Sequence, residues 1–130
     1  NIFFEVNNYL SELMAKVKGY ETQIEEIHHT EKLDAPSGTA ISLANQIIEN
    51  TRYTNWALGH KNPETIPITA KRIENVPGTH EVVYNSEVDT IAIKHTAHSR
   101  EGFALGAVIA AEWIKNKKGI YNLKDVLNIG

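Results

Sequence analysis

One short stretch of the chain gathers most of the side chains that can move a proton or bind an anion. Residues 28–40 read HHTEKLDAPSGTA. His28 and His29 titrate near neutral pH, so either can give or take a proton. Lys32 can pair with a carboxylate or, where its pKa is lowered, donate a proton. This composition favours a site that combines acid/base chemistry with recognition of an anion.

The end of the same stretch has the composition of a helix start. Ser37 is a good N-cap, and the backbone N–H groups that follow it have no partner within the helix. Those N–H groups, with the hydroxyls of Ser37 and Thr39, can hold a carboxylate, and Gly38 lets a ligand approach the backbone closely. A plain helix cap after a proline turn explains these residues equally simply, and taken alone they favour that explanation.

The acid/base groups act together only if the elements around them bring them to one side. Residues 20–29 predict a strand in which Ile24, Glu26 and His28 share a face. If the chain stayed extended through Lys32, His28 and Lys32 would point to the same side roughly 13 Å apart, at about 3.3 Å per residue. A turn after His29 would bring them closer. In both cases the two side chains can line one cleft.

Hydrophobic periodicity and turn residues predict the remaining elements. Helices are expected at residues 2–17, 39–50 and 99–116, the last capped by Ser99, and further strands at residues 65–75, 81–85 and 89–97. We also expect a surface loop at residues 51–65, a break at Pro67 and a turn at residues 76–80. Such a mixture indicates an α+β domain, with one mixed β-sheet and helices packed on one face.

Composition excludes several classes of function. The 130 residues suggest one domain, of which 42% are hydrophobic and 22% charged. The formal net charge of −3 argues against binding to nucleic acid, which needs a basic surface. No apolar run is long enough to span a membrane. The chain has no cysteine, so disulfides and thiolate metal sites are excluded, and a cytoplasmic location fits.

The other histidines and the glycines give weaker signals. His60, His80, His95 and His98 are spread along the chain without an H-E-x-x-H motif, so we expect no metal site. Among the arginines, Arg72 and Arg100 are the best candidates for a functional role, although a surface ion pair would explain each of them. There is no G-x-G-x-x-G after a strand and no G-x-x-x-x-G-K-[ST], so no nucleotide-binding loop is recognised.

The stretch from Glu26 to Ala40 resembles the signature of the dihydrodipicolinate reductases, also called 4-hydroxy-tetrahydrodipicolinate reductases. The family pattern E-x-H-H-x-x-K-x-D-A-P-S-G-T-A is met at each specified position. Residues 72–114 resemble the family's R-x-x-x-x-x-G-x-H segment followed by H-x-A-x-S-R-x-x-F-A-x-G-A. Residues 119–127 resemble its closing G-x-Y-x-M-x-D-V-L, with Leu123 in place of Met.

This resemblance implies an oxidoreductase of lysine and diaminopimelate biosynthesis. Such an enzyme reduces 4-hydroxy-tetrahydrodipicolinate, or dihydrodipicolinate, to tetrahydrodipicolinate with NADPH or NADH. In the family an N-terminal Rossmann domain binds the cofactor, and a C-terminal domain binds substrate and forms a homotetramer through its sheet. The chain looks like the second part, with residues 1–98 as its core and residues 99–130 returning to pack on the Rossmann domain. We therefore expect this chain alone to be inactive, with no cofactor-binding residues and no metal.

The resemblance also implies roles for individual residues. His28 corresponds to the acid/base histidine and Lys32 to the proton-donating lysine. The residues that bind the carboxylates of the dicarboxylate substrate correspond to His29, Gly38 and Thr39, with Ser37 and Arg100 as helpers. Thr30 and Glu31 stand where many members have basic residues, which lowers the local positive charge.

Two other functions remain open from the sequence. The chain can be the substrate domain of a different two-domain nicotinamide dehydrogenase, which would take another ligand. It can also be a non-enzymatic oligomerisation domain whose histidines are structural. Binding of pyridine-2,6-dicarboxylate, a planar mimic of the substrate ring, would separate these possibilities.

Overall fold

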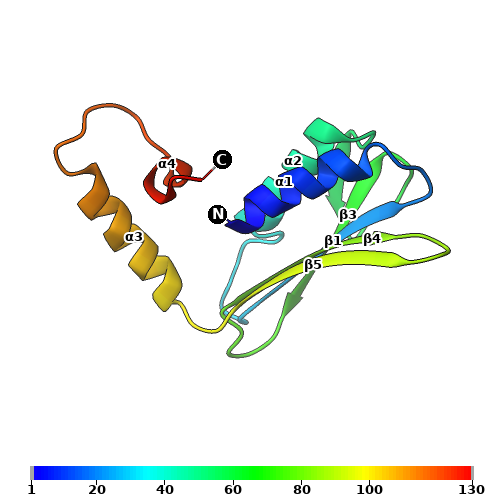
Figure 1. The fold of residues 1–130 in the computed structure, drawn as a ribbon. Coiled ribbons are helices and arrows are strands. Elements are labelled where there is room, and N and C mark those ends of the chain that lie inside the picture. Colours follow the sequence, from blue (N-terminus) through cyan, green and yellow to red (C-terminus); the bar gives the residue numbers. More distant parts are fainter. Residues whose placement is uncertain (1, 130) are drawn as a thin grey trace.

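Five strands form one mixed sheet in the order β2-β3-β1-β4-β5 (Figure 1). The computed structural model describes residues 2–129. The strands are β1 (Glu21–His28), β2 (Asn55–Leu58), β3 (Thr65–Arg72), β4 (Gly78–Asn85) and β5 (Thr90–Ala97). The central strand β1 is parallel to β3 and antiparallel to β4, with Ile24 between Ile68 and Val82. The sheet thus places the end of β1 beside the start of β4.

Two helices, α1 (Ile2–Met14) and α2 (Gly38–Asn50), lie side by side on one face of this sheet (Figure 1). Alternate strand residues meet apolar side chains of α2 and form the core. Its buried members are Met14, Ile24, Ala40, Leu43, Ala44, Ile47, Tyr53, Ile66, Ile68, Val82 and Tyr84. This arrangement confirms the predicted α+β class with helices on one face of a mixed sheet.

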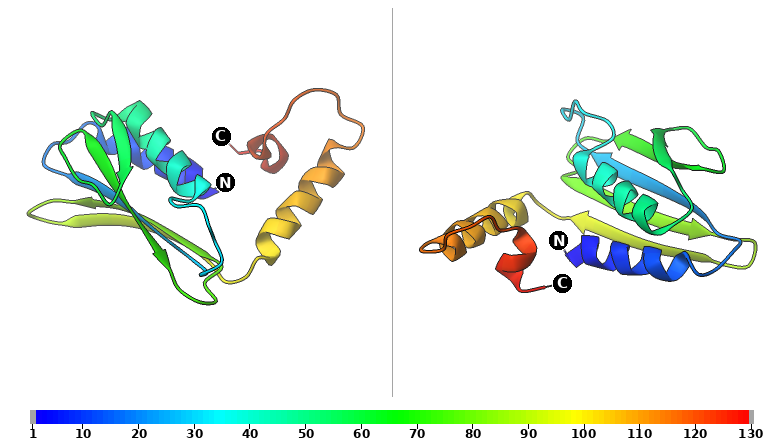
Figure 2. Two further views of the ribbon diagram at one scale, coloured as in Figure 1. Left: turned by 180° about the vertical axis from the view of Figure 1, so that it is seen from behind. Right: turned by 90° about the horizontal axis from the view of Figure 1, so that it is seen from above.

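The C-terminal part forms an arm beside the sheet (Figure 2). It consists of α3 (Glu101–Ile114) and the short α4 (Leu123–Leu127). No residue of α3 is buried, and Phe103, Leu105 and Val108 are all more than half exposed. The arm returns to α1 at its end, where Nζ of Lys124 lies 2.5 Å from Oε1 of Glu5. No helix within residues 2–129 is both long and apolar enough to cross a membrane.

The structure corrects the predicted loop at residues 51–65 and the predicted break at Pro67. Residues 55–58 form the edge strand β2, which was missed because four residues are too few for a periodic signal. Pro67 lies within β3, opposite Ala57 of β2. Proline removes one backbone donor, but the pairing of β3 with β1 begins only at Ile68, one residue after Pro67, so β3 continues.

Several predicted boundaries also move. The first helix ends at Met14 instead of residue 17. Strand β4 begins at Gly78, inside the segment expected to be a turn, because it pairs with β5 from Gly78 on and with β1 from Thr79 on. Arg100 occupies the N-cap of α3 without a side-chain capping bond, although Oγ of the expected cap, Ser99, accepts the N–H of Glu101.

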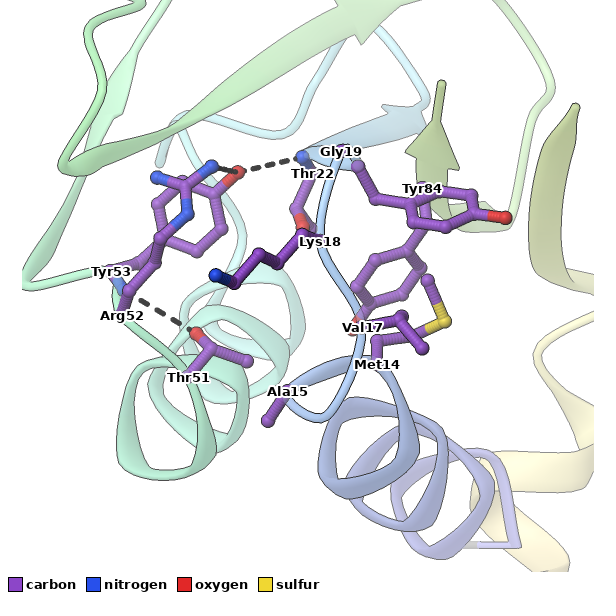
Figure 3. Close-up of a pocket in the computed structure, with 11 residues that line it drawn as sticks. Met14, Ala15, Val17, Lys18, Gly19, Thr22, Thr51, Arg52, Tyr53 and Tyr84 are labelled. Atoms are coloured by element: carbon purple, nitrogen blue, oxygen red, sulfur yellow. Dashed lines mark hydrogen bonds between the residues drawn. The ribbon is translucent and has the colours of Figure 1, made fainter. Parts of the chain in front are cut away.

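A cavity of about 440 Å³ lies at the end of the sheet where β1 begins (Figure 3). Its walls come from the ends of α1 and α2, from β1 and from β4. The buried hydroxyl of Tyr53 accepts the N–H of Thr22 at 2.9 Å and a bond from Arg52 at 3.3 Å. None of the lining residues is a histidine or a carboxylate, so this cavity holds none of the predicted acid/base groups.

Candidate active site

The carboxyl end of β1 brings the predicted acid/base groups to one groove. The strand ends at His28, and the chain then turns, with the N–H of Lys32 donating to the carbonyl of His29 at 3.2 Å. The turn therefore brings Lys32 back toward His28, as the second of our two sequence alternatives requires. Both histidines and Lys32 line a groove of about 980 Å³.

The remaining walls of this groove come from segments far apart in the sequence. The start of β4 contributes Gly78 and His80, and the end of β5 contributes His95. The segment from Thr96 to Arg100 crosses to the arm, whose α3 presents Phe103 and several small residues. The groove thus lies between the sheet body and the arm, and both parts supply side chains.

The start of α2 behaves as a capped helix N-terminus. Ser37 has an extended backbone, and its Oγ accepts the N–H of Ala40 at 3.2 Å. The same oxygen lies 2.9 Å from Nε2 of His80, and Ser37 is only 2% exposed. Thr39 is exposed and lines the groove. The helix start therefore points Thr39 to the groove, while Ser37 serves the cap and His80.

A buried carboxylate lies beneath His28. Glu26 has no solvent exposure, and its Oε2 is 2.5 Å from Nδ1 of His28. Its other oxygen is 2.5 Å from Nη1 of Arg72. These contacts partner both oxygens of a charge that would be costly to bury alone. Alternate residues of β1 face the same side, which is why Glu26 and His28 meet.

His28 and His80, which both line the groove, favour their neutral forms. Burial lowers the pKa of His80 to about 4, with His28 as the next largest cause. Burial also lowers the pKa of His28, while the carboxylate of Glu26 opposes that shift. The rings pack edge to face with centroids 5.1 Å apart. A neutral imidazole can accept a proton or, through its N–H, donate a hydrogen bond.

Lys32 is held at the rim of the groove. Its Nζ lies 2.9 Å from Oδ1 of Asp34, and the hydrogen bond from Lys32 lowers the pKa of that exposed carboxyl group. Arg72 fixes the surrounding loop by donating from Nε to the carbonyl of Lys32 at 3.3 Å and from Nη2 to that of Asp34 at 2.7 Å. An anion in the groove would compete with Asp34 for the ammonium group.

Glu26, His28 and His80 also have the spacing of a possible metal centre, since one ligand-type atom of each lies within 4.8 Å of the others. Each residue already has a polar partner, however. Arg72 and His28 pair with Glu26, and Ser37 pairs with His80. We interpret the cluster as an acid/base network, and our expectation that the chain binds no metal stays a prediction.

The structure brings five of the seven predicted site residues into one groove: His28, His29, Lys32, Thr39 and Arg100. Gly38 is exposed at the start of α2 but does not line the groove, and Ser37 lies behind it. Their assignments to substrate stay predictions. No phosphate-binding glycine loop follows a strand within residues 2–129, so these residues do not fit a nicotinamide cofactor site of that type.

Sequence reasoning gave no role to Glu26, His80 or Gly78. A β-carbon at Gly78 would stand 3.1 Å from Nε2 of His28, so glycine gives the imidazole its space. The alternation along β1 placed Glu26 on the face of His28 and was the available signal. His80 could not be found this way, because its position depends on the pairing of β1 with β4.

Comparison with known proteins decides the family. Residues 1–127 match the family described as "Dihydrodipicolinate reductase, C-terminus". The chain belongs to this family. It is 57% identical over 129 residues to the 4-hydroxy-tetrahydrodipicolinate reductase of Christiangramia forsetii, a match that covers 98% of this chain and 54% of that protein. The corresponding reductase of Aquifex aeolicus is 41% identical over 129 residues, covering 92% and 49%.

The fold is also that of a solved reductase. The structure described as "Dipicolinate bound Dihydrodipicolinate reductase from Paenisporosarcina sp. TG-14" superposes with a TM-score of 0.67 at 24% identity, covering 95% of this chain and 51% of that one. The chain spans about half the length of the curated relatives that it matches. The predicted family membership is therefore confirmed.

Proposed function

We propose that this chain is the substrate-binding half of an NAD(P)H-dependent 4-hydroxy-tetrahydrodipicolinate reductase of lysine biosynthesis. The observation that carries the proposal is the family match over residues 1–127, which includes each residue assigned to the groove. A relative of this name shares 57% of the aligned residues. The groove adds a chemical argument, since it combines an acid/base histidine, a lysine and a helix start.

The groove residues divide into two roles. Thr39, His29 and Arg100 provide a hydroxyl, an imidazole and a guanidinium for the carboxylates of a cyclic dicarboxylate, with the N–H groups at the start of α2 behind Thr39. Ser37 supports this helix start through its capping bond. Holding both carboxylates would orient the ring against the proton-handling groups and reduce the entropy cost of reaction.

His28 and Lys32 are assigned to proton delivery. When bound, the nicotinamide cofactor supplies a hydride to C4 of the unsaturated ring, and we assign its binding to the part of the complete protein outside this chain. Reduction moves negative charge toward C3 and the ring nitrogen. A proton must then be delivered to the reduced ring. His28, at the end of β1, and Lys32, in the turn that follows, both line the groove and can deliver the proton.

The arm and the open sheet face suggest where other parts of the protein pack. We assign residues 99–130 to contact with a cofactor domain, because α3 buries none of its large apolar side chains here. We assign the sheet face opposite α1 and α2 to a homotetramer interface. This face is uncovered and carries Ile27 and Val83, which are only partly exposed, between polar neighbours.

A binding experiment separates this function from the alternatives. Titration of the complete protein with pyridine-2,6-dicarboxylate should give saturable binding that Thr39→Ala weakens. Reduction of 4-hydroxy-tetrahydrodipicolinate, followed by loss of NADPH or NADH absorbance, should be lost in His28→Gln. A protein that binds no dicarboxylate but forms a stable tetramer would instead be an oligomerisation domain. Binding of a different acid with turnover would indicate another nicotinamide dehydrogenase.

A further inference from the structure

Glu26 is a buried, groove-associated charge for which the proposed function gives no role. It has no solvent exposure and does not line the groove, so it cannot touch a ligand there. A buried carboxylate is expensive, and an apolar residue of similar size often replaces one without loss of stability. A role in the chemistry of a neighbouring group would explain the carboxylate at this position.

One oxygen of Glu26 determines the state of the His28 ring. Oε2 of Glu26 and Nδ1 of His28 are 2.5 Å apart, and neither atom has a hydrogen-bond partner elsewhere among the described residues. Two bare acceptors would repel at this distance, so Nδ1 carries a proton. The other nitrogen, Nε2, lies beside Gly78, and both residues line the groove. Nε2 is therefore the nitrogen that exchanges protons there.

The second oxygen of Glu26 is linked to the segment that carries Lys32. Nη1 of Arg72 lies 2.5 Å from Oε1 of Glu26. The same guanidinium donates to the carbonyls of Lys32 and Asp34. One buried carboxylate thus touches His28 directly and reaches the loop of Lys32 through a single arginine.

We propose that Glu26 is a positioning residue, which sets the tautomer and orientation of His28 and, through Arg72, the placement of the Lys32 segment. The inference rests on the proposed function, because it concerns the proton delivery assigned to His28 and Lys32. Gly78 completes the arrangement from the opposite side. The imidazole lies between a carboxylate and a backbone position at which a β-carbon would stand only 3.1 Å from Nε2.

The charges around His28 give the proposal a measurable signature. Glu26 on β1 raises the pKa of His28, whereas burial, Lys32 and Arg72 lower it. The remaining titratable group packed against the ring is His80 on β4, which favours its neutral form near pH 7. Removing the carboxylate therefore lowers the pKa of His28 further. The limb of the pH–rate profile that belongs to His28 should move to lower pH.

The test compares Glu26→Gln with wild type in the complete reductase, using 4-hydroxy-tetrahydrodipicolinate and NADPH or NADH across a range of pH. We expect kcat to fall about ten-fold or more. Positioned acid/base groups contribute roughly 10²–10⁴-fold to the rate, and loss of positioning removes part of that contribution. KM should change less than two-fold, and the His28 limb should move to lower pH. Glu21→Gln is the matched control, since it makes the same change at the exposed, opposite end of β1 and should leave all three quantities unchanged.

The outcomes separate the inference from the function on which it rests. A wild-type profile in Glu26→Gln, with His28→Gln inactive, overturns the positioning role and leaves the proposed function intact. A lower kcat with an unmoved pH limb also overturns it, because a merely structural defect would look like this. Near-normal kcat in His28→Gln would instead contradict the proposed function itself.

A folding defect in Glu26→Gln does not remove the test. Its source would be Arg72, left without its partner in a partly buried site. The double variant Glu26→Gln, Arg72→Gln replaces both charges with neutral amides and avoids an unpaired one. Since Arg72 is the weaker influence on His28, the limb should still move to lower pH. A folded double variant with an unmoved limb overturns the proposal.

Discussion

Lys32 can act on substrate binding or on the reaction itself, and the two roles leave different kinetic marks. If it only holds a ground-state carboxylate, its loss raises KM and spares kcat. If it delivers a proton or stabilises charge after hydride addition, its loss lowers kcat. We predict that Lys32→Ala in the complete enzyme lowers kcat far more than it raises KM, as measured by steady-state kinetics. A near-normal kcat with raised KM would leave Lys32 as a binding residue only.

Two companion variants make this result specific. His28→Ala should also act on kcat, and the double variant should be little worse than either single one, because we assign both residues to one proton-delivery step. Thr39→Ala should act mainly on KM, since its hydroxyl is placed to touch substrate and transition state alike. Additive losses in the His28–Lys32 pair would mean that the two residues serve separate steps.

His80 should make the fold sensitive to acid. Its pKa is about 4 in the folded protein, against 6.5 for an ordinary histidine, so the unfolded chain binds a proton more readily. Stability contributed by neutral His80 is therefore full above pH 6.5 and is lost as pH falls toward 4, by about 3 kcal/mol in total. Urea unfolding between pH 7 and pH 4 should show this slope.

The variant His80→Gln should flatten that dependence while keeping a group that can bond to Ser37. The comparison is His60→Gln, which changes a histidine on an exposed loop and should leave the slope as in wild type. The pKa of His80 also depends on the charges of neighbouring groups, namely Glu26, His28, Lys32 and His95. The His80→Gln variant therefore removes only one part of the total pH dependence. An unchanged slope in His80→Gln would show that His80 is not the titrating group.

Among the elements, β1 depends at its start on a side chain from outside the sheet. The hydroxyl of Tyr53 accepts the N–H of Thr22, and both residues are buried (Figure 3). We predict that Tyr53→Phe destabilises the protein by about 1–3 kcal/mol, because a buried backbone donor loses its acceptor. Tyr9→Phe removes a hydroxyl from a tyrosine that is 64% exposed and should be neutral. Equal midpoints of urea unfolding would refute the prediction.

The elements differ in how far the sequence determined them. Helix α2 was predicted within one residue, because Ser37 marks its start and its apolar residues repeat at helical spacing. The strand β1 was predicted within one residue at each end. In contrast, β2 and the first residues of β4 exist through pairing with distant strands, which local periodicity does not report.

The candidate site divides in the same way. Residues 28–40 are contiguous, so their chemistry could be recognised in the sequence, and the family resemblance assigned their roles. The salt link from Arg72 to Glu26 and the contact of His80 with Ser37 join residues more than 40 positions apart. Only the parallel pairing of β1 with β3 and the antiparallel pairing with β4 bring them together. The family patterns mark Glu26, Arg72 and His80 as fixed positions, but their contacts were beyond single-sequence reasoning.

For the whole molecule, we predict that the 130-residue chain by itself has no reductase activity and does not bind NADPH. The reason is that the groove holds the groups we assign to carboxylate binding but no phosphate-binding glycine loop. Calorimetry should detect binding of pyridine-2,6-dicarboxylate and none of NADPH. Micromolar affinity for the cofactor would mean that the nucleotide site has been misplaced.

The uncovered sheet face should determine the oligomeric state of the complete protein. Helices cover one face only (Figure 1), and the other is built from the alternate strand residues, including Ile27 and Val83. We predict a dimer or tetramer formed through the strands between residues 65 and 97. Light scattering over a range of concentrations should show that Val83→Glu dissociates it, because a carboxylate would be buried between facing sheets. Val88→Glu, at a turn where the side chain is 89% exposed, should keep the wild-type mass. A wild-type monomer at high concentration would contradict the assignment of this face.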